Sequence, residues 1–313
     1  MKPTNKFSRA FIDLAKVGRT DWRSVALTIL LVEFLKILFD LSSVVALDSP
    51  IFPGHRILHI PNADKMVGYR VADAAAYTFG LWLACKTILR RPFRSLISTN
   101  MTFDIRRCFL GTTLYLAANA VSLMAISLFW SMRAGTWVLP FHHFQWPFHN
   151  EQIAASIATL IVIPFLAFSE ELFFRAWLTQ TLGHYIRSTI AVVALVAGLF
   201  AAYHTQYNLQ GKMVVVLSSL GFSALSLRDQ RLELAIGAHS MMNVCATLSL
   251  LFFTGPESHT QILATTLDLW TILILKSVLP YALMYGFLQK TRGWFAPADG
   301  RLASPGEVQP SPL

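Results

Sequence analysis

Long apolar stretches without charged residues alternate along the chain with short polar segments. A helix needs about 20 predominantly apolar residues to cross the hydrocarbon core of a bilayer. The uncharged stretches cover residues 108–132, 152–169, 188–211, 213–227 and 234–256. Three further apolar stretches, each with two or three charged residues, cover residues 25–47, 71–89 and 267–289. The pattern predicts an all-α, polytopic membrane protein with about eight transmembrane helices.

One of the predicted helices is short. As a helix, residues 213–227 would extend about 22 Å, whereas the hydrocarbon core is about 30 Å thick. The polar residues 205–212 just before it would then dip into the membrane. Irregular backbone is tolerated at that depth only where it lines protein or a wet cavity. We therefore expect residues 205–212 to line such a region.

The composition agrees with a membrane protein. Only 14% of the 313 residues are charged, and the mean hydropathy is +0.51, whereas soluble domains carry about 25% charged residues. The net charge of +9 does not indicate a nucleic-acid partner, because the basic residues lie between apolar stretches rather than on one soluble face. The two sets of alternate loops, termini included, hold 17 and five Lys and Arg residues. This bias predicts that both termini are cytoplasmic.

The residues before the first apolar stretch form a candidate amphipathic helix. Apolar and charged side chains recur there at helical spacing, with Phe7, Phe11, Leu14 and Val17 opposite Arg9, Asp13 and Lys16. A helix of this kind typically lies on a membrane surface with its apolar face in the lipid. We therefore expect residues 1–24 to form an arm on the cytoplasmic surface of the bilayer.

Ionisable residues inside apolar stretches are the first candidates for function, because they are expensive to bury in a membrane. Glu170 and Glu171 directly follow an apolar run, and Arg175 lies four residues after Glu171. This spacing places Glu171 and Arg175 on one helix face as an ion pair. Glu170 is rotated by about 100° and is left without that partner. An unpaired carboxylate of this kind is a candidate general base toward water.

Two histidines and an asparagine complete the candidate site. His204 ends the apolar run that includes Phe200, and His239 precedes Asn243 by four residues, so these last two side chains point the same way along a helix. A carboxylate, two imidazoles and a carboxamide supply a base for water, groups that protonate or bind a metal, and a donor for an oxyanion. This set of groups indicates hydrolysis.

These residues form three ordered motifs that resemble those of a known family. Glu170-Glu171-Leu172-Phe173-Phe174-Arg175, Phe200 to His204, and His239-Ser240-Met241-Met242-Asn243 resemble the EExxxR, FxxxH and HxxxN motifs of the CPBP family. This family comprises CAAX prenyl endopeptidases and bacteriocin-processing or immunity proteins, and is also called Abi. The resemblance covers residues 152–255. It implies an intramembrane endopeptidase with its site in a cavity of the helical core.

The resemblance also implies a role for each motif residue. Glu170 would activate water, with His204 orienting or polarising it. His239 and Asn243 would stabilise the tetrahedral oxyanion, and Glu171 and Arg175 would hold the site together. The family has been described both as metal-dependent and as glutamate-dependent without metal. Glu170, His204 and His239 could bind zinc in an open site, although the chain has no HExxH pair on one helix.

The positions of the motifs also bear on helix boundaries. As drawn from charge alone, the predicted helices place Glu170 and His204 at opposite depths in the membrane. The two groups come together if the helix that holds Glu170 runs on through residues 172–178 and the next helix begins nearer Val192. We therefore expect both changes.

Three rival functions remain open. Gly221-Phe222-Ser223-Ala224 resembles the GxSx of rhomboid serine proteases, but only 16 residues separate Ser223 from His239. A transporter is suggested by the charged face of Glu33, Lys36 and Asp40 and by three further charges inside apolar stretches, Asp73, Lys86 and Lys276. Internal pairing of the first three at i,i+3 and i,i+4 is the favoured explanation of that face. A non-enzymatic membrane scaffold or immunity protein would use the motif residues for structure alone.

With the resemblance included, the chain is expected to have five segments. They are a cytoplasmic arm (1–24), N-terminal membrane helices and loops (25–150), a CPBP-like catalytic core (151–255), the last membrane helix (256–294) and a disordered tail (295–313). The expected partners are the lipid bilayer and a membrane protein or peptide. A prenylated C terminus, the leader of a secreted peptide and a sorting-signal helix would all fit as substrates.

Overall fold

The computed structural model describes residues 9–48, 63–139, 142–144, 146, 148–254 and 265–295. Almost all of this part of the chain is helical, which confirms the predicted fold class. The helices are α1 (Ala10–Asp13), η1 (Leu14–Val17), α2 (Trp22–Asp48), α3 (Ala63–Thr87), η2 (Phe93–Leu96), α4 (Ile105–Ala134), α5 (Asn150–Glu171), η3 (Leu172–Leu178), α6 (Thr179–Tyr185), α7 (Thr189–Tyr203), α8 (Leu209–Asp229), α9 (Glu233–Phe252), α10 (Thr266–Ser277) and α11 (Leu279–Thr291). Two short antiparallel strands, β1 (His142–Phe144) and β2 (Phe253–Thr254), pair with each other.

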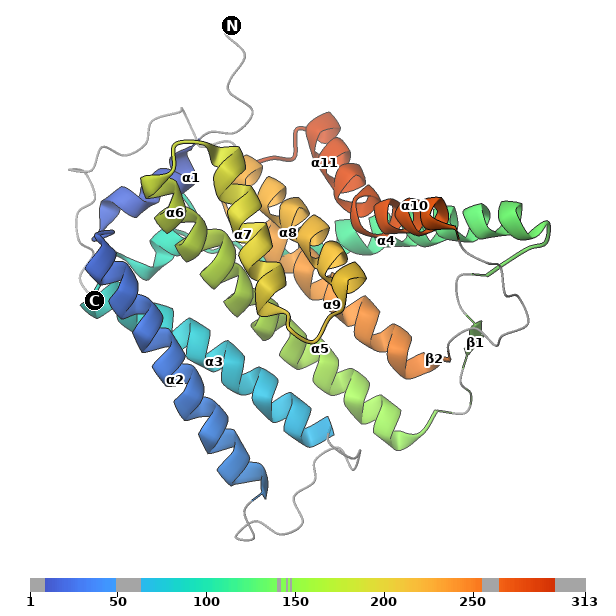
Figure 1. Cartoon of the computed structure of the whole chain (residues 1–313), viewed down its shortest axis with the longest axis horizontal. Helices are drawn as coiled ribbons and strands as arrows, with labels where there is room; N and C mark the ends of the chain where they lie inside the picture. The colour runs from blue at the N-terminus through green and yellow to red at the C-terminus, as the bar shows by residue number, and fades with distance from the viewer. Residues whose placement is uncertain are drawn as a thin grey trace, which may run out of the picture.

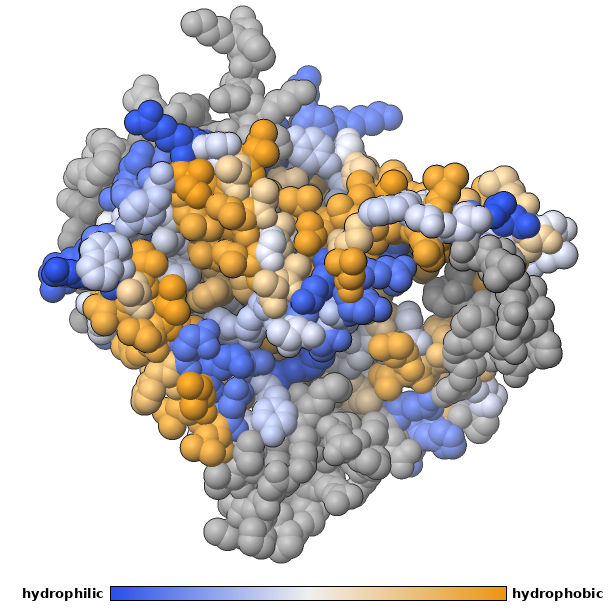
Figure 2. All heavy atoms as spheres, in the orientation of Figure 1, coloured by the Kyte–Doolittle hydropathy of each residue, from blue (hydrophilic) through white to orange (hydrophobic). Residues whose placement is uncertain are grey.

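Five helical segments of the described residues are long and apolar enough to cross a membrane. They are Ile105–Ala134, Gln152–Tyr185, Leu209–Asp229, Glu233–Phe252 and Thr266–Thr291. Helix α7 is apolar but shorter, and α2 and α3 are long but carry several charged residues. The predicted number of about eight spans is therefore not confirmed as a count. Apolar side chains cover much of the outer surface, including the faces of α7 and α10 (Figure 2).

The boundaries drawn from charge alone were wrong at two helices. The helix predicted over residues 152–169 continues without a break through η3 and α6 to Tyr185, as the motif positions required. Its charged residues are compatible with a long helix because they are buried against other protein groups rather than solvated. Helix α7 begins at Thr189, where the Ser188 side chain accepts a hydrogen bond from the Ala191 amide, and not near Val192.

Two further boundaries also differ from the predicted ones. The short predicted helix 213–227 is extended at both ends. It begins at Leu209 because Asn208 caps it by accepting a hydrogen bond from the Gly211 amide at 2.9 Å, and it ends at Asp229, where Gln230 adopts the left-handed conformation. The last predicted helix, 267–289, is divided between α10 and α11 at Val278. Pro280 lies in the first turn of α11, where its missing N–H removes no intrahelical hydrogen bond.

The expected surface arm does not lie with its apolar face outward. Of its four apolar residues, Phe7 is outside the described residues, and Val17 is exposed. Phe11 and Leu14 are buried in the main hydrophobic core, together with Ile12, and α1 packs on α6. These side chains therefore gain their burial from the protein rather than from lipid. The predicted disordered tail falls, apart from Phe295, outside the described residues.

The helices are arranged around α5, which packs between α3 and α9 (Figure 1). The α2–α3 hairpin lies on one side of it, and α4 packs along α9 on the other. Helices α7 and α8 form a second hairpin, and α10 and α11 pack on α4. Helix α5 is thus the element from which the remaining helices are positioned.

Both ends of the described chain meet the turn between α8 and α9. The Phe11 amide donates to the Gln230 side chain at 2.7 Å, and the Phe295 amide donates to the Asp229 carboxylate at 2.7 Å. Arg107, at the start of α4, also donates to Asp229, from Nε at 3.0 Å. The two ends therefore lie at the same end of the helix bundle. Their placement on the cytoplasmic side of a membrane remains a prediction.

Helices α4 and α9 approach so closely that a glycine is needed on each. A Cβ atom at Gly237 would lie 2.0 Å from the Cys108 carbonyl oxygen, and one at Gly111 would lie 2.4 Å from the Leu234 carbonyl oxygen. Close backbone approach of this kind is typical of helix packing in membranes. It fixes the depth of α9, and with it the position of His239 and Asn243.

We predict that Gly237→Ala lowers the free energy of unfolding by about 3 kcal/mol, because the new methyl group can be accommodated only if the two backbones separate. The measurement is thermal or denaturant unfolding in detergent micelles. Gly198→Ala on α7 is the matched control, since nothing lies within 4 Å of its new Cβ atom. An equal loss of stability in both variants would contradict this account of the α4–α9 contact.

Candidate active site

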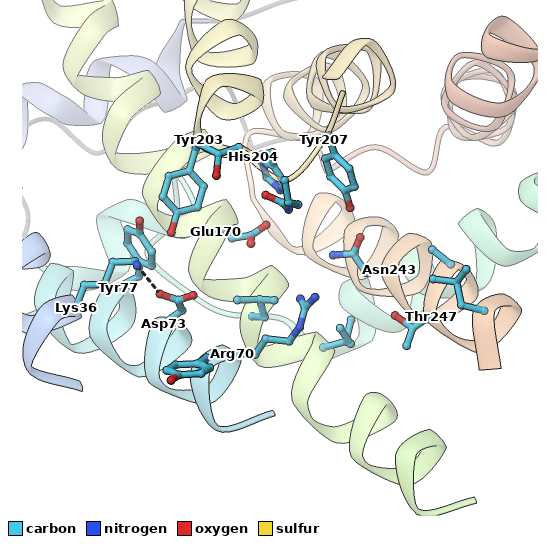
Figure 3. A pocket seen from close by; sticks show the side chains of 17 residues that line it. Lys36, Arg70, Asp73, Tyr77, Glu170, Tyr203, His204, Tyr207, Asn243 and Thr247 are labelled. Carbon is cyan, nitrogen blue, oxygen red and sulfur yellow. Dashed lines mark ion pairs between the residues drawn. The ribbon is translucent and has the colours of Figure 1, made fainter. Parts of the chain in front are cut away.

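A polar cavity of about 1000 Å³ opens beside the C-terminal half of α5 (Figure 3). The cavity lies next to the turn between α7 and α8. The N-terminal part of α5 and the C-terminal part of α9 continue past this turn (Figure 1). Its wall contains residues of α2, α3, α5, α7, the α7–α8 turn and α9, namely Lys36, Tyr69, Arg70, Asp73, Tyr77, Ile163, Leu166, Glu170, Tyr203, His204, Thr205, Gln206, Tyr207, Asn243, Ala246, Thr247 and Leu250. Polar residues gather in this region of the surface, between apolar faces (Figure 2).

The cavity exists because α7 is short. Its 15 residues extend about 22 Å, and the chain turns back at His204 before it reaches the far ends of α5 and α9. Residues Thr205, Gln206 and Tyr207 of the turn line the space that is left. The expectation that the polar residues before α8 line protein or a wet cavity is confirmed at these three positions.

Glu170 and Glu171 are adjacent in sequence but face different surroundings. Glu170 is 8% exposed and lines the cavity, whereas Glu171 is 0% exposed and faces the protein interior. The 100° step between neighbouring helical residues produces this difference. Directly after Glu171 the helix widens into the π-helical turn η3, a feature that is frequent at functional sites.

The Glu171 carboxylate is the centre of a buried charged cluster. Its Oε1 atom lies 3.2 Å from Nη1 of Arg175 and 2.8 Å from Nδ1 of His239. The predicted Glu171–Arg175 pair is therefore confirmed. The Arg175 guanidinium lies 4.0 Å from the centroid of the Phe200 ring and 5.1 Å from that of Phe222, so both rings contribute cation–π contacts.

His239 lies behind Glu170 rather than in the cavity wall. It is 2% exposed, and its ring stacks on the ring of Phe222, with the two centroids 4.5 Å apart. Its Nε2 atom lies 3.4 Å from Oε2 of Glu170. Glu170 therefore has a partner, contrary to the expectation from helical spacing, and His239 does not line the cavity. The reason is that Phe222 of α8 covers the part of α9 where His239 lies.

His204 and Asn243 do face the cavity (Figure 3). Nδ1 of His204 lies 2.8 Å from the Phe200 carbonyl oxygen. A carbonyl only accepts, so Nδ1 carries the hydrogen and Nε2 is the ring nitrogen left for a ligand. The imidazole also stacks on Tyr207, with the ring centroids 5.8 Å apart and the planes 6° from parallel. These contacts fix the ring orientation of His204.

The three residues considered as zinc ligands do not form one site. Nδ1 of His239 faces Glu171 and Nε2 faces Glu170, and the ring does not line the cavity that Glu170 and His204 share. Among the described residues, no group of three His, Cys, Asp or Glu side chains converges at metal-binding geometry. The residues present therefore do not fit a three-ligand zinc site.

The sequence motifs did not identify the wall formed by α2 and α3. Lys36 pairs with Asp73 at 3.2 Å and with Asp40 at 3.3 Å, and Lys36, Asp73 and Arg70 all line the cavity. Lys36, Asp40 and Asp73 were expected to be charges inside apolar stretches, and the internal i,i+4 pair of Lys36 with Asp40 is confirmed. Their position next to Glu170 could not be expected, because it depends on α3 packing against α5. Ser223 is buried on α8 and does not line this cavity.

Comparison with known proteins relates this part of the chain to a family. Residues 152–245 match the family of the type II CAAX prenyl endopeptidase Rce1-like proteins. The resemblance to CAAX prenyl endopeptidases that the three motifs indicated is thus confirmed over these residues. This is a family of membrane-embedded endopeptidases, and with the five apolar helical segments it indicates a multi-pass integral membrane protein.

One relative among curated proteins is the uncharacterized protein YyaK of Bacillus subtilis (strain 168). The two sequences are 29% identical over 174 residues, which cover 53% of this chain and 54% of YyaK. The chain therefore spans about half the length of this relative. No solved structure matches the chain.

We predict losses of stability of very different size for the two neighbouring glutamates. Glu171→Gln should lower the free energy of unfolding by about 3–5 kcal/mol, because it leaves the buried Arg175 guanidinium without its counter-charge. Glu170→Gln makes the same chemical change at the cavity wall and should cost less than about 1 kcal/mol. Thermal unfolding of both variants in the same detergent is the measurement. A larger loss in Glu170→Gln than in Glu171→Gln would show that the buried cluster does not depend on Glu171.

Proposed function

We propose that this protein is an intramembrane endopeptidase that hydrolyses a membrane-anchored peptide with water activated by Glu170. One observation supports it most: Glu170 lines the cavity together with His204 and Asn243, and the buried His239 lies directly behind it. The matching family supports a prenylated C-terminal peptide as the substrate class. The apolar outer faces of the surrounding helices would hold the lipid anchor in the bilayer.

The reaction would begin with a water molecule held between Glu170 and His204. Glu170 accepts a proton from the water as its oxygen attacks the scissile carbonyl carbon. The carbonyl oxygen becomes an oxyanion, which accepts a hydrogen bond from the Asn243 amide nitrogen. When the C–N bond breaks, Glu170 returns the proton to the leaving amine. The peptide bond and water are consumed, and a carboxylic acid and an amine are formed.

His239 would act from behind Glu170 rather than on the substrate. Its Nδ1 atom donates to Glu171, so Nε2 is the atom that holds or releases a proton next to Glu170. Through this contact His239 would hold the Glu170 carboxylate in position at the cavity wall.

We predict that Glu170→Gln lowers kcat/KM by about 100- to 10,000-fold, because the amide cannot accept the proton of water. The measurement is the cleavage of quenched fluorescent peptides that contain an S-farnesyl cysteine, with the protein in lipid nanodiscs. Glu33→Gln is the matched control, since Glu33 is exposed on α2 and does not line the cavity. Wild-type rates in the Glu170→Gln variant would rule out Glu170 as the base.

We predict that Asn243→Ala lowers kcat by about 100- to 1000-fold while KM changes little, since a donor to the oxyanion acts only in the transition state. Thr247→Ala is the matched control one helical turn further along α9, where the side chain also lines the cavity. Steady-state kinetics on the same peptides separates the two parameters. A rise in KM alone would instead assign Asn243 to substrate binding.

The Glu170→Gln variant also separates the proposed peptidase from its rivals. The ion-paired Lys36 and Asp73 in the cavity wall are the feature that a transporter would use. Transport that depends on these residues should survive the change at Glu170, and a scaffold should be unaffected by it. Loss of proteolysis with retained folding is the outcome that fits a peptidase.

A further inference from the structure

One cation of the cavity wall, Arg70, forms no salt bridge among the described residues and interacts with Asp73 only at longer range. Arg70 lies on α3, three residues before Asp73, and lines the same cavity as Glu170. Its guanidinium points into the cavity, toward the side where Glu170 and Asn243 lie (Figure 3). Within the described part of the chain, Arg70 forms no hydrogen bond or ion pair, whereas Lys36 pairs with both Asp40 and Asp73.

This pairing decides which sign of charge the cavity can bind. Asp73, the acid nearest to Arg70 along α3, is already held by Lys36 at 3.2 Å. Glu170 has His239 behind it at 3.4 Å. The cavity therefore offers a ligand one free guanidinium and no free acidic group on the α3 wall. A guanidinium presents N–H donors in a planar fork that matches the two oxygens of a carboxylate.

The size of the cavity indicates what kind of molecule would supply a carboxylate to Arg70. A volume of about 1000 Å³ is at the upper end of the range for pockets that enclose a drug-sized molecule. It accommodates a few residues at the end of a peptide rather than a folded chain. A free N terminus would bring a positive charge next to Arg70 and be repelled, whereas a free C terminus would bring the matching anion.

We propose that Arg70 binds the C-terminal carboxylate of the peptide substrate and thereby sets the distance between the chain end and the bond at Glu170. The proposal rests on the peptidase function proposed above, and it adds a specificity residue outside the segment that matches the family. The carboxylate would pair with the guanidinium in bidentate geometry, on the α3 side of the cavity. Asn243 and Glu170 would contact the scissile peptide group on the opposite side.

The test compares two forms of one peptide, an S-farnesyl cysteine followed by three apolar residues, with either a free acid or an amide at its C terminus. In nanodiscs of zwitterionic lipid, the wild type should cleave the acid with a kcat/KM roughly 10- to 100-fold above that of the amide, as expected for a hydrogen bond to a charged group. Arg70→Gln should remove this preference by lowering the rate on the acid alone. The matched control is Arg106→Gln, which changes an exposed arginine on α4 and should leave the preference for the acid intact.

A binding measurement separates failure of this proposal from failure of the peptidase function. The Glu170→Gln protein, with and without Arg70→Gln, is titrated with both peptides labelled with a fluorophore. Tighter binding of the acid that requires Arg70 would support the anion site even if the wild type cleaves neither peptide, which would contradict only the peptidase function. Equal binding of acid and amide, or a preference that survives Arg70→Gln, would overturn the proposal. Loss of the preference for the acid in nanodiscs of anionic lipid would also overturn the proposal, because it would assign Arg70 to a lipid head group.

Discussion

The carboxylate of Glu171 is the group on which the arrangement of the helices around the site depends. It joins Arg175, one turn further along the same helix, to His239 on α9. The Arg175 guanidinium is in turn covered by Phe200 of α7 and Phe222 of α8. One buried charge therefore connects four helical segments. Removing one partner from a buried ion pair leaves an uncompensated charge, so each member holds the others in place.

The second constraint is the length of α7. Because this helix ends at His204, the α7–α8 hairpin covers only part of α5 and α9 and leaves a polar cavity beyond it. Glu170 lies at the boundary between the covered and the open part of α5. A carboxylate in this position contacts a buried imidazole on one side and the cavity on the other, which is the arrangement that the proposed hydrolysis requires.

Several features of the site could be predicted from the sequence because they depend on local helical geometry. Glu171 and Arg175 are four residues apart, so their pairing follows from the period of one helix. The helical class and the apolar segments follow from the same periodicity and from composition. The role of residues 205–207 in lining a cavity could also be expected, since polar residues between two apolar helices need a polar environment.

Other features depended on contacts between helices that no local pattern specifies. The sequence by itself determined that this is a helical membrane protein, and its three motifs grouped Glu170, Glu171, Arg175, His204, His239 and Asn243 as one candidate site. Only the tertiary structure decided that Phe222 covers His239 and places it behind Glu170, and that α3 brings the unpaired Arg70 into the cavity wall. The physical reason is that helical spacing fixes which side chains share a face. What that face meets is fixed by packing, here by the close approach of α9 to α4 and of α5 to α3.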